Sequence, residues 1–279
     1  MRLFVMASLM FLVSCVSMQE SVPVPKNTID KFSITQQLPT LPSGSKLIPG
    51  THFSVIFADS AATLLIPVPF VGDAVTGAIN TSKSESYTEH YVGIDIINFA
   101  KDAFQSSPFY SDTQQQTQLY PMAYIQESFD DVFRISLTVE VKSPTWTGRY
   151  LYHIPIHIPV DDIKEPTTSE VDTLRAELKA GMKKLAELIE RDLTGQLNST
   201  KQMVDFGSYY IYGSNLGGLI TPSVMHLSDG QLIEEGSDYV IFRHSGDPSV
   251  AGNAGALLFG VHYFHKNQLH TYELSDSSD

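Results

Sequence analysis

The sequence predicts an α+β fold, in which an antiparallel meander sheet is covered by two helices and followed by a β-rich C-terminal region. Three observations lead to this prediction. Two segments carry apolar residues at helical spacing, and three consecutive strand-like runs lie between them. The last part of the chain consists of short β-forming runs separated by glycines. Helices and an antiparallel sheet of this kind pack as two layers around one core.

The first fourteen residues have the organisation of a signal peptide. Arg2 supplies a positive charge, and the apolar run from Leu3 to Val13 follows it. A helix that crosses a bilayer needs about 20 apolar residues, so this run is too short to be one. We therefore assign residues 1–14 to a cleaved leader.

The end of the leader resembles the lipobox of bacterial lipoproteins. The motif is Leu12-Val13-Ser14-Cys15, and Cys15 is the only cysteine in the chain. The resemblance implies that the thiol of Cys15 is acylated and that Cys15 becomes the first residue of the mature protein. Val16 follows it in place of the aspartate that retains many such proteins in the inner membrane, which implies a Gram-negative outer membrane and a periplasm-facing body.

Residues 15–50 are polar and contain several prolines, a composition typical of a flexible tether. Residues 51–200 are expected to form the α+β domain, which begins with a strand from His52 to Phe57. The apolar segment from Ala61 to Ile79 contains Pro67 and Pro69, which exclude a spanning helix. It is interpreted as core, with a flap that touches lipid or a partner as the alternative.

A helix is predicted from Tyr87 to Phe104, with Ser106-Ser107-Pro108 ending it. The three strand-like runs that follow are Leu119 to Phe129, Val132 to Val141 and Trp146 to Ile158. Turn residues separate them, so they are expected to pair as an antiparallel meander.

The strongest helical pattern extends from Glu170 to Leu193. Ser169 and Asp172 suggest a capping box at its start, and Gly195 is a natural stop. From residue 201 to 279 the short strand-like runs predict a β-rich subdomain, or an extension of the first sheet.

The formal net charge of −13 argues against a nucleic-acid surface, because such surfaces are basic. The sequence contains no Gly-x-Ser-x-Gly elbow, phosphate-binding loop, His-Glu-x-x-His helix or calcium-binding loop. No cofactor is expected other than the covalent lipid on Cys15, which also removes thiol chemistry from consideration.

Histidines are the one reactive residue type that forms clusters. His262, His265 and His270 flank an expected hairpin tip at Lys266-Asn267, and with a carboxylate such as Glu273 they are the candidate metal ligands. His153 and His157 lie on one face of a strand but are too far apart to share a metal unaided. Locally bonded histidines remain the alternative.

Trp146, Arg149 and Tyr150 are the candidate binding residues, because aromatic side chains on a strand can stack on a glycan or a partner. The alternative is that these side chains are half-buried in the sheet.

The order strand, helix, meander, long helix resembles that of small envelope lipoproteins that assist transport or assembly machines. We therefore expect a non-enzymatic envelope lipoprotein that docks to another envelope protein. Two alternatives remain open: a metal-dependent enzyme or binder that uses the C-terminal histidines, and a glycan- or peptidoglycan-binding module.

Overall fold

The computed structural model describes residues 20–41, 45–56, 85, 88–127, 132–159, 165–200, 230–245 and 259–268. It also describes the short segments 203–205, 208–210, 214–216, 219–221, 224–226 and 273–275. The leader, Cys15, the segment from Ala61 to Ile79 and His270 lie outside these residues. Within the described part of the chain, no helix is long and apolar enough to cross a bilayer.

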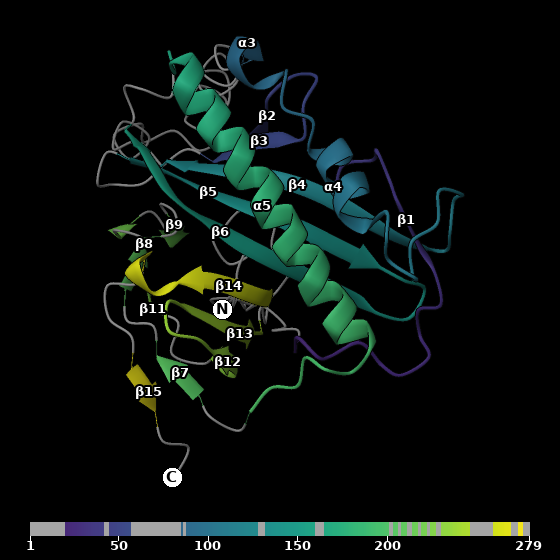
Figure 1. The fold of residues 1–279 in the computed structure, drawn as a ribbon. Coiled ribbons are helices and arrows are strands. Elements are labelled where there is room, and N and C mark those ends of the chain that lie inside the picture. Colours follow the sequence, from purple (N-terminus) through teal and green to yellow (C-terminus); the bar gives the residue numbers. More distant parts are fainter. Residues whose placement is uncertain are drawn as a thin grey trace, which may run out of the picture.

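A mixed β-sheet with two helices on one face forms the body, which confirms the α+β class (Figure 1). Its three long strands are β4 (Thr117–Glu127), β5 (Val132–Lys142) and β6 (Thr147–Pro159). They lie next to one another and are antiparallel. Parallel strands adjoin this trio on both sides, so the whole sheet is not a simple meander.

On the β4 side, the sheet continues through N-terminal strands. These are β1 (Phe32–Ile34), β2 (Ser45–Leu47) and β3 (Phe53–Ile56). Both β1 and β3 run parallel to β4, and β2 pairs antiparallel with β3.

On the β6 side, the sheet continues through C-terminal strands. They are β14 (Gly260–His265), β13 (Tyr239–His244), β12 (Gly230–Glu235), β7 (Met203–Asp205) and β15 (Glu273–Ser275). A 3₁₀ turn, η2 (Lys266–Gln268), follows β14, which pairs in parallel with β6. These strands therefore continue the sheet that contains β4, β5 and β6.

Four further short strands form two separate antiparallel pairs. One pair joins β8 (Ser208–Tyr210) to β11 (Val224–His226). The other joins β9 (Ser214–Leu216) to β10 (Leu219–Thr221).

The helix predicted from Tyr87 to Phe104 is interrupted. α3 (Thr88–Tyr91) and α4 (Ile96–Phe104) are separated by a turn, and Val92 in that turn is exposed. Asp95 starts α4 by accepting a hydrogen bond from the backbone N–H of Asn98 at 2.9 Å. The N-cap preference of this aspartate therefore outweighs the apolar spacing that runs through it.

The long helix α5 (Thr168–Leu193) lies across β5 and β6, and α4 packs against β4 (Figure 1). Its capping box uses Thr167 and Glu170, two residues before the predicted pair Ser169 and Asp172. Its end is as expected: Gly195 has a φ of +71°, and the N–H groups of Gly195 and Gln196 donate to the carbonyls of Asp192 and Arg191. This is a Schellman arrangement, which favours glycine at that position.

Gly181 brings α5 close to the sheet. A Cβ atom at this position would lie 2.6 Å from Cδ1 of Tyr152 on β6. The absent side chain therefore makes room for the aromatic ring between helix and sheet.

The two faces of the sheet differ in character. Side chains alternate between faces along a strand. On β5 the residues that face the helices are apolar, namely Ile135, Leu137, Val139 and Val141. The intervening residues are polar and also buried, namely Arg134, Ser136, Thr138 and Glu140. The main hydrophobic core thus lies under α4 and α5, and a buried polar layer lies on the opposite face.

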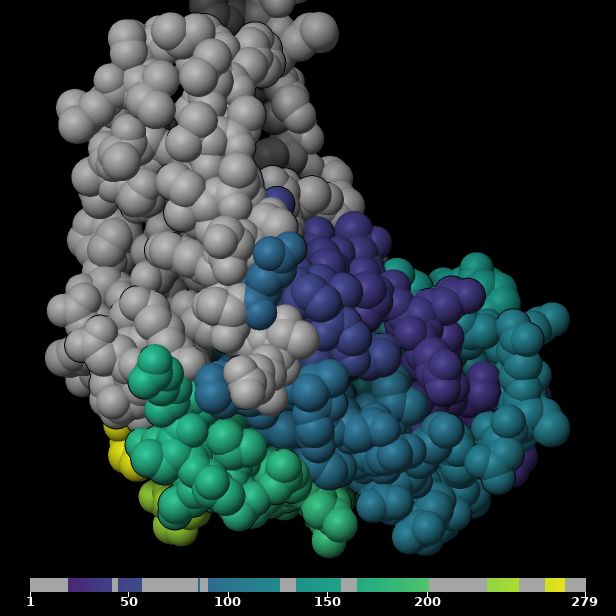
Figure 2. Space-filling view, turned by 90° about the horizontal axis from the view of Figure 1, so that it is seen from above, coloured from purple at the N-terminus to yellow at the C-terminus, as the bar shows by residue number. Residues whose placement is uncertain are grey.

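The described part of the predicted tether, residues 20–41 and 45–50, is folded onto the body. Ile29, Phe32 and Ile48 are buried in the main core. Phe32 packs edge-on against Phe104 of α4, with ring centroids 5.2 Å apart. Figure 2 shows the purple N-terminal residues packed against the blue and teal residues that follow them in the chain. Burial of these apolar side chains outweighs the proline-rich composition that indicated a flexible tether.

Candidate functional site

The predicted histidine cluster does not assemble in the described residues. His262 and His265 lie three positions apart on β14, so their side chains point to opposite faces of the sheet. His262 contacts His153, whereas His265 contacts Tyr152 on the helix side. Among the residues that the structure describes, no group of three His, Cys, Asp or Glu side chains could hold a metal ion. His262 and His265 therefore do not share a site, and His270 lies outside the described residues.

The three predicted binding residues are buried in the sheet. Trp146, Arg149 and Tyr150 are only 7%, 6% and 1% exposed, so they cannot stack on a glycan or a partner. Arg149 instead forms an ion pair with Glu140, with 2.6 Å between Nη2 and Oε2. Trp146 and Tyr150 belong to the main core.

A hydrogen-bonded row of three side chains crosses the polar face of the sheet. Oγ of Ser136 lies 2.9 Å from Nδ1 of His153, and Nε2 of His153 lies 3.1 Å from Nδ1 of His262. Ser136 and His153 are register partners on β5 and β6, and β14 brings His262 beside them. Residues far apart in the sequence therefore meet, which no local pattern could indicate.

Aromatic rings enclose this row. Phe264 stacks on His153 at 3.7 Å between ring centroids, and Phe242 stacks on His262 at 4.8 Å. Burial lowers the pKa of His153 well below its ordinary value, and the nearby His262 lowers it further. His153 is consequently held neutral near pH 7.

A row of one hydroxyl and two imidazoles can transfer a proton along its hydrogen bonds. A hydroxyl beside an imidazole, as in Ser136 and His153, is also the arrangement of an activated nucleophile. Here the three residues are 0%, 1% and 0% exposed. A substrate cannot reach Ser136 in this structure, so the row holds strands β5, β6 and β14 in register.

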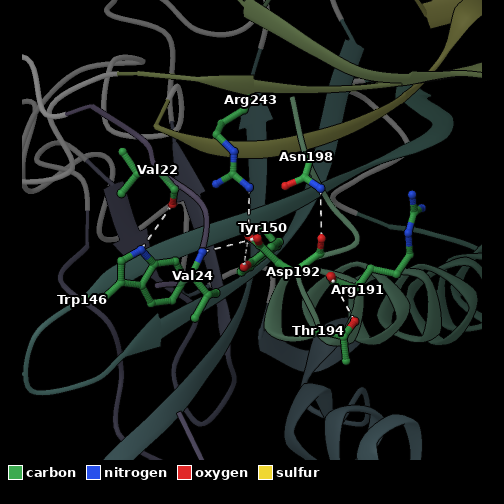
Figure 3. Close-up of polar contacts among 10 residues, drawn as sticks. Val22, Val24, Trp146, Tyr150, Arg191, Asp192, Thr194, Asn198 and Arg243 are labelled. Atoms are coloured by element: carbon green, nitrogen blue, oxygen red, sulfur yellow. Dashed lines mark hydrogen bonds and ion pairs between the residues drawn. The ribbon is translucent and has the colours of Figure 1, made fainter. Parts of the chain in front are cut away.

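A second polar cluster lies at the end of α5 (Figure 3). Asp192 is 1% exposed. Its Oδ2 accepts a hydrogen bond from the Tyr150 hydroxyl at 2.7 Å and an ion-pair contact from Nη2 of Arg243 at 2.9 Å. Burial, together with the neighbouring carboxylate, raises the pKa of Tyr150 well above its ordinary value. The cluster joins α5, β6 and β13 through one buried carboxylate.

The N-terminal segment, residues 20–25, is bound to this cluster. The backbone N–H of Val24 donates to Oδ1 of Asp192 at 3.4 Å, and Nε1 of Trp146 donates to the Val22 carbonyl at 3.2 Å (Figure 3). The backbone N–H of Ser21 donates to Oγ of Ser245 at 3.2 Å. No sequence pattern indicates this arrangement, because neither Asp192 nor Arg243 belongs to a recognisable motif.

A group of tyrosines lies beside α5 near His265. Tyr263 stacks between Tyr152 and Tyr239, with centroid distances of 5.3 and 5.1 Å. The Tyr152 hydroxyl is 3.0 Å from Nε2 of His265. Burial lowers the pKa of His265, although Asp238 and Glu177 act in the opposite direction. His265 is thus occupied by a structural contact.

A polar depression of about 280 Å³ lies at the edge formed by β1 and β4. It is lined by Ser33, Ile34, Thr35, Gln36, Gln37, Asp112, Gln114 and Gln118. Two of these side chains are held by neighbouring tyrosines: Tyr110 donates to Asp112, and Tyr120 donates to Gln118.

No family model matches the chain, and neither a curated protein nor a solved structure matches it.

Proposed function

We propose that this chain is a lipoprotein of the outer membrane, anchored through lipid on Cys15, and that its α+β body binds another protein of the cell envelope. The observation that carries the anchor is the sequence Leu12-Val13-Ser14-Cys15 after a short apolar run. Two or more acyl chains give lasting attachment, since each buried methylene contributes about 0.8 kcal/mol.

The structure of the N-terminal segment supports this proposal. Within a few residues of Cys15 the chain enters the body, where the backbone groups of Ser21, Val22 and Val24 are hydrogen-bonded. An anchor joined in this way restrains the body itself at the membrane, as a binding component of an envelope assembly requires.

The chemistry of the interior supports a binding role for the body. Ser136, His153 and His262 hold three strands together, and Asp192 joins α5 to β6 and β13. These buried polar groups give the body a defined shape, and a defined shape limits the ordering cost of binding a partner.

Replacement of the thiol tests the anchor. We expect Cys15→Ser to move the protein from the membrane fraction to the soluble fraction, because a hydroxyl is not the acylated group of the motif. Ser14→Ala is the matched control, since it keeps a small residue before the cysteine. Mass spectrometry of the native protein should show a cleaved N-terminus with acyl mass on Cys15. An intact leader or a free thiol would refute the anchor.

Crosslinking in intact cells tests the partner. We expect a short crosslinker to join the lipidated protein reproducibly to one envelope protein, and we expect that product to disappear with Cys15→Ser. Recovery of the lipidated protein without any reproducible crosslinked species would refute the binding role while leaving the anchor in place.

A further inference from the structure

We propose that one end of the body, which we call the anchor end, faces the membrane surface. The anchor end consists of the N-terminal segment 20–25, the β5–β6 turn and the C-terminal end of α5. This inference rests on the proposed lipid anchor at Cys15, and it adds the orientation of the body. It follows from the number of residues between Cys15 and the body, from three hydrogen bonds of the N-terminal segment, and from the charge of the residues exposed at the β5–β6 turn and at the end of α5.

Chain length limits the distance between bilayer and body. Ser21 is six residues after Cys15. Even a fully extended chain covers at most about 3.6 Å per residue, so Ser21 lies within about 22 Å of the lipidated cysteine. A flexible tether over residues 15–50 would have allowed a much longer reach.

The contacts of the N-terminal segment determine which part of the body is held there. Ser21 is hydrogen-bonded to Ser245 at the end of β13, and Val22 to Trp146 just before β6. Val24 is hydrogen-bonded to Asp192 in the last turn of α5. These three attachment points come from three different elements and lie at the same end of the sheet (Figures 1 and 3). The segment therefore fixes one end of the body at the anchor.

The composition of the anchor end suits a surface of lipid headgroups. The β5–β6 turn exposes Pro144 and Thr145, and the end of α5 exposes Thr194 and Gln196. These four residues are uncharged, and segment 20–25 adds a single exposed carboxylate, Glu20, whereas the chain as a whole carries a formal charge of −13. Because like charges repel, an acidic protein approaches an anionic leaflet most readily by an end that carries little negative charge. Val22, 42% exposed, adds an apolar side chain there.

The length of helix α5 gives the distance between the anchor end and the opposite end of the body. It spans 26 residues, which corresponds to about 39 Å at 1.5 Å per residue. Its C-terminal end is at the anchor end, so its first turn is at the opposite end of the body. A partner must then reach the sides or the distal end while the body stays near its own membrane.

Energy transfer to labelled lipid tests the orientation. The only natural cysteine carries the lipid, so a second cysteine is a unique labelling site. A donor dye is placed on Thr145→Cys at the anchor end or on Ser169→Cys in the first turn of α5; both residues are exposed. The full lipidated protein is then reconstituted in vesicles with an acceptor on the lipid headgroup. We expect clearly higher transfer efficiency from position 145 than from position 169.

The outcomes of this experiment distinguish a wrong orientation from a missing lipid anchor. Equal transfer from the two positions, or higher transfer from position 169, overturns the orientation while the lipid anchor stands. If mass spectrometry of the same sample shows no lipid, the anchor and the orientation both fall. A variant with about 20 Gly and Ser residues inserted after Val16 is a further test, since such a linker adds about 25 Å of mean reach. The difference between the positions should shrink; an unchanged difference would overturn the argument from chain length.

Discussion

Asp192→Ala is expected to lower the free energy of unfolding of the body by about 3–5 kcal/mol, because it leaves the buried guanidinium of Arg243 without its counterion. Asp192 and Arg243 are 1% and 3% exposed. The same carboxylate accepts hydrogen bonds from the Tyr150 hydroxyl and the Val24 backbone, so the substitution also weakens the docking of the N-terminal segment. Urea unfolding of the mature body, followed by tryptophan fluorescence, measures the effect, since Trp146 contacts that segment.

Asp172→Ala is the matched control. Asp172 lies on the same helix and pairs with Arg175, but its side chain is 61% exposed. Exposed ion pairs contribute little to stability, so this variant should unfold close to the wild type. The double variant Asp192→Leu with Arg243→Met should recover part of the loss, because two apolar side chains leave no buried charge unpaired. If Asp192→Ala and Asp172→Ala have equal small effects, Asp192 does not hold the body together.

The body should lose stability as the pH falls below about 6.5, before carboxylates protonate. The reference pKa of histidine in an unfolded chain is about 6.5, whereas burial holds the pKa of His153 well below it. Below pH 6.5 the unfolded chain therefore binds a proton that the folded chain does not bind. Stability is complete above this pH and declines by about 1.4 kcal/mol per pH unit as the pH falls toward the folded pKa.

Protonation of Glu140 lowers the stability of the body in a second, lower pH range. Its burial raises the pKa of this carboxyl, but Arg149 and Lys142 outweigh burial and leave the pKa below the ordinary value. The folded state therefore binds this proton less readily than the unfolded chain, and stability declines further once the pH falls below about 4.5. The two ranges can be separated by urea unfolding at half-unit steps of pH from 7.5 to 4.

His153→Gln is the informative variant for the upper range. It removes the titrating ring while keeping a polar side chain next to Ser136. We expect a lower stability at pH 7.5 and a clearly smaller decline between pH 6.5 and 5.5. His90→Gln is the control, because His90 is only partly buried on the short helix α3 and should leave the decline unchanged. An identical decline in wild type and His153→Gln would exclude the buried row as its cause.

Local patterns predicted the elements whose signals are local. The alternation from Val132 to Val141 indicated β5, and the apolar stripe up to Leu193 indicated α5, with Gly195 as its end. Each of these signals depends on neighbours in the sequence. The antiparallel contact between β5 and β6 is of the same kind, since a short turn joins the two strands.

The rest depended on contacts between distant residues. Prolines near Val22 indicated a tether, but Phe32 contributes a large buried ring that only the folded core can accommodate. His262 and His265 were grouped because they are close in sequence, although strand alternation separates them. His153 contacts His262, which follows it by more than a hundred residues. Asp192 on α5 pairs with Arg243 on β13. The spacing rules for helices and strands cannot predict those pairs.

The parallel pairing of β14 with β6 has a consequence for biogenesis. The strand that completes the middle of the sheet comes from residues 260–265, long after β6 in the chain. Until those residues have been synthesised, this edge of β6 has no neighbouring strand, and such edges promote aggregation. Pairings between distant segments also form slowly. The middle of the sheet therefore closes late, after β14 has paired with β6.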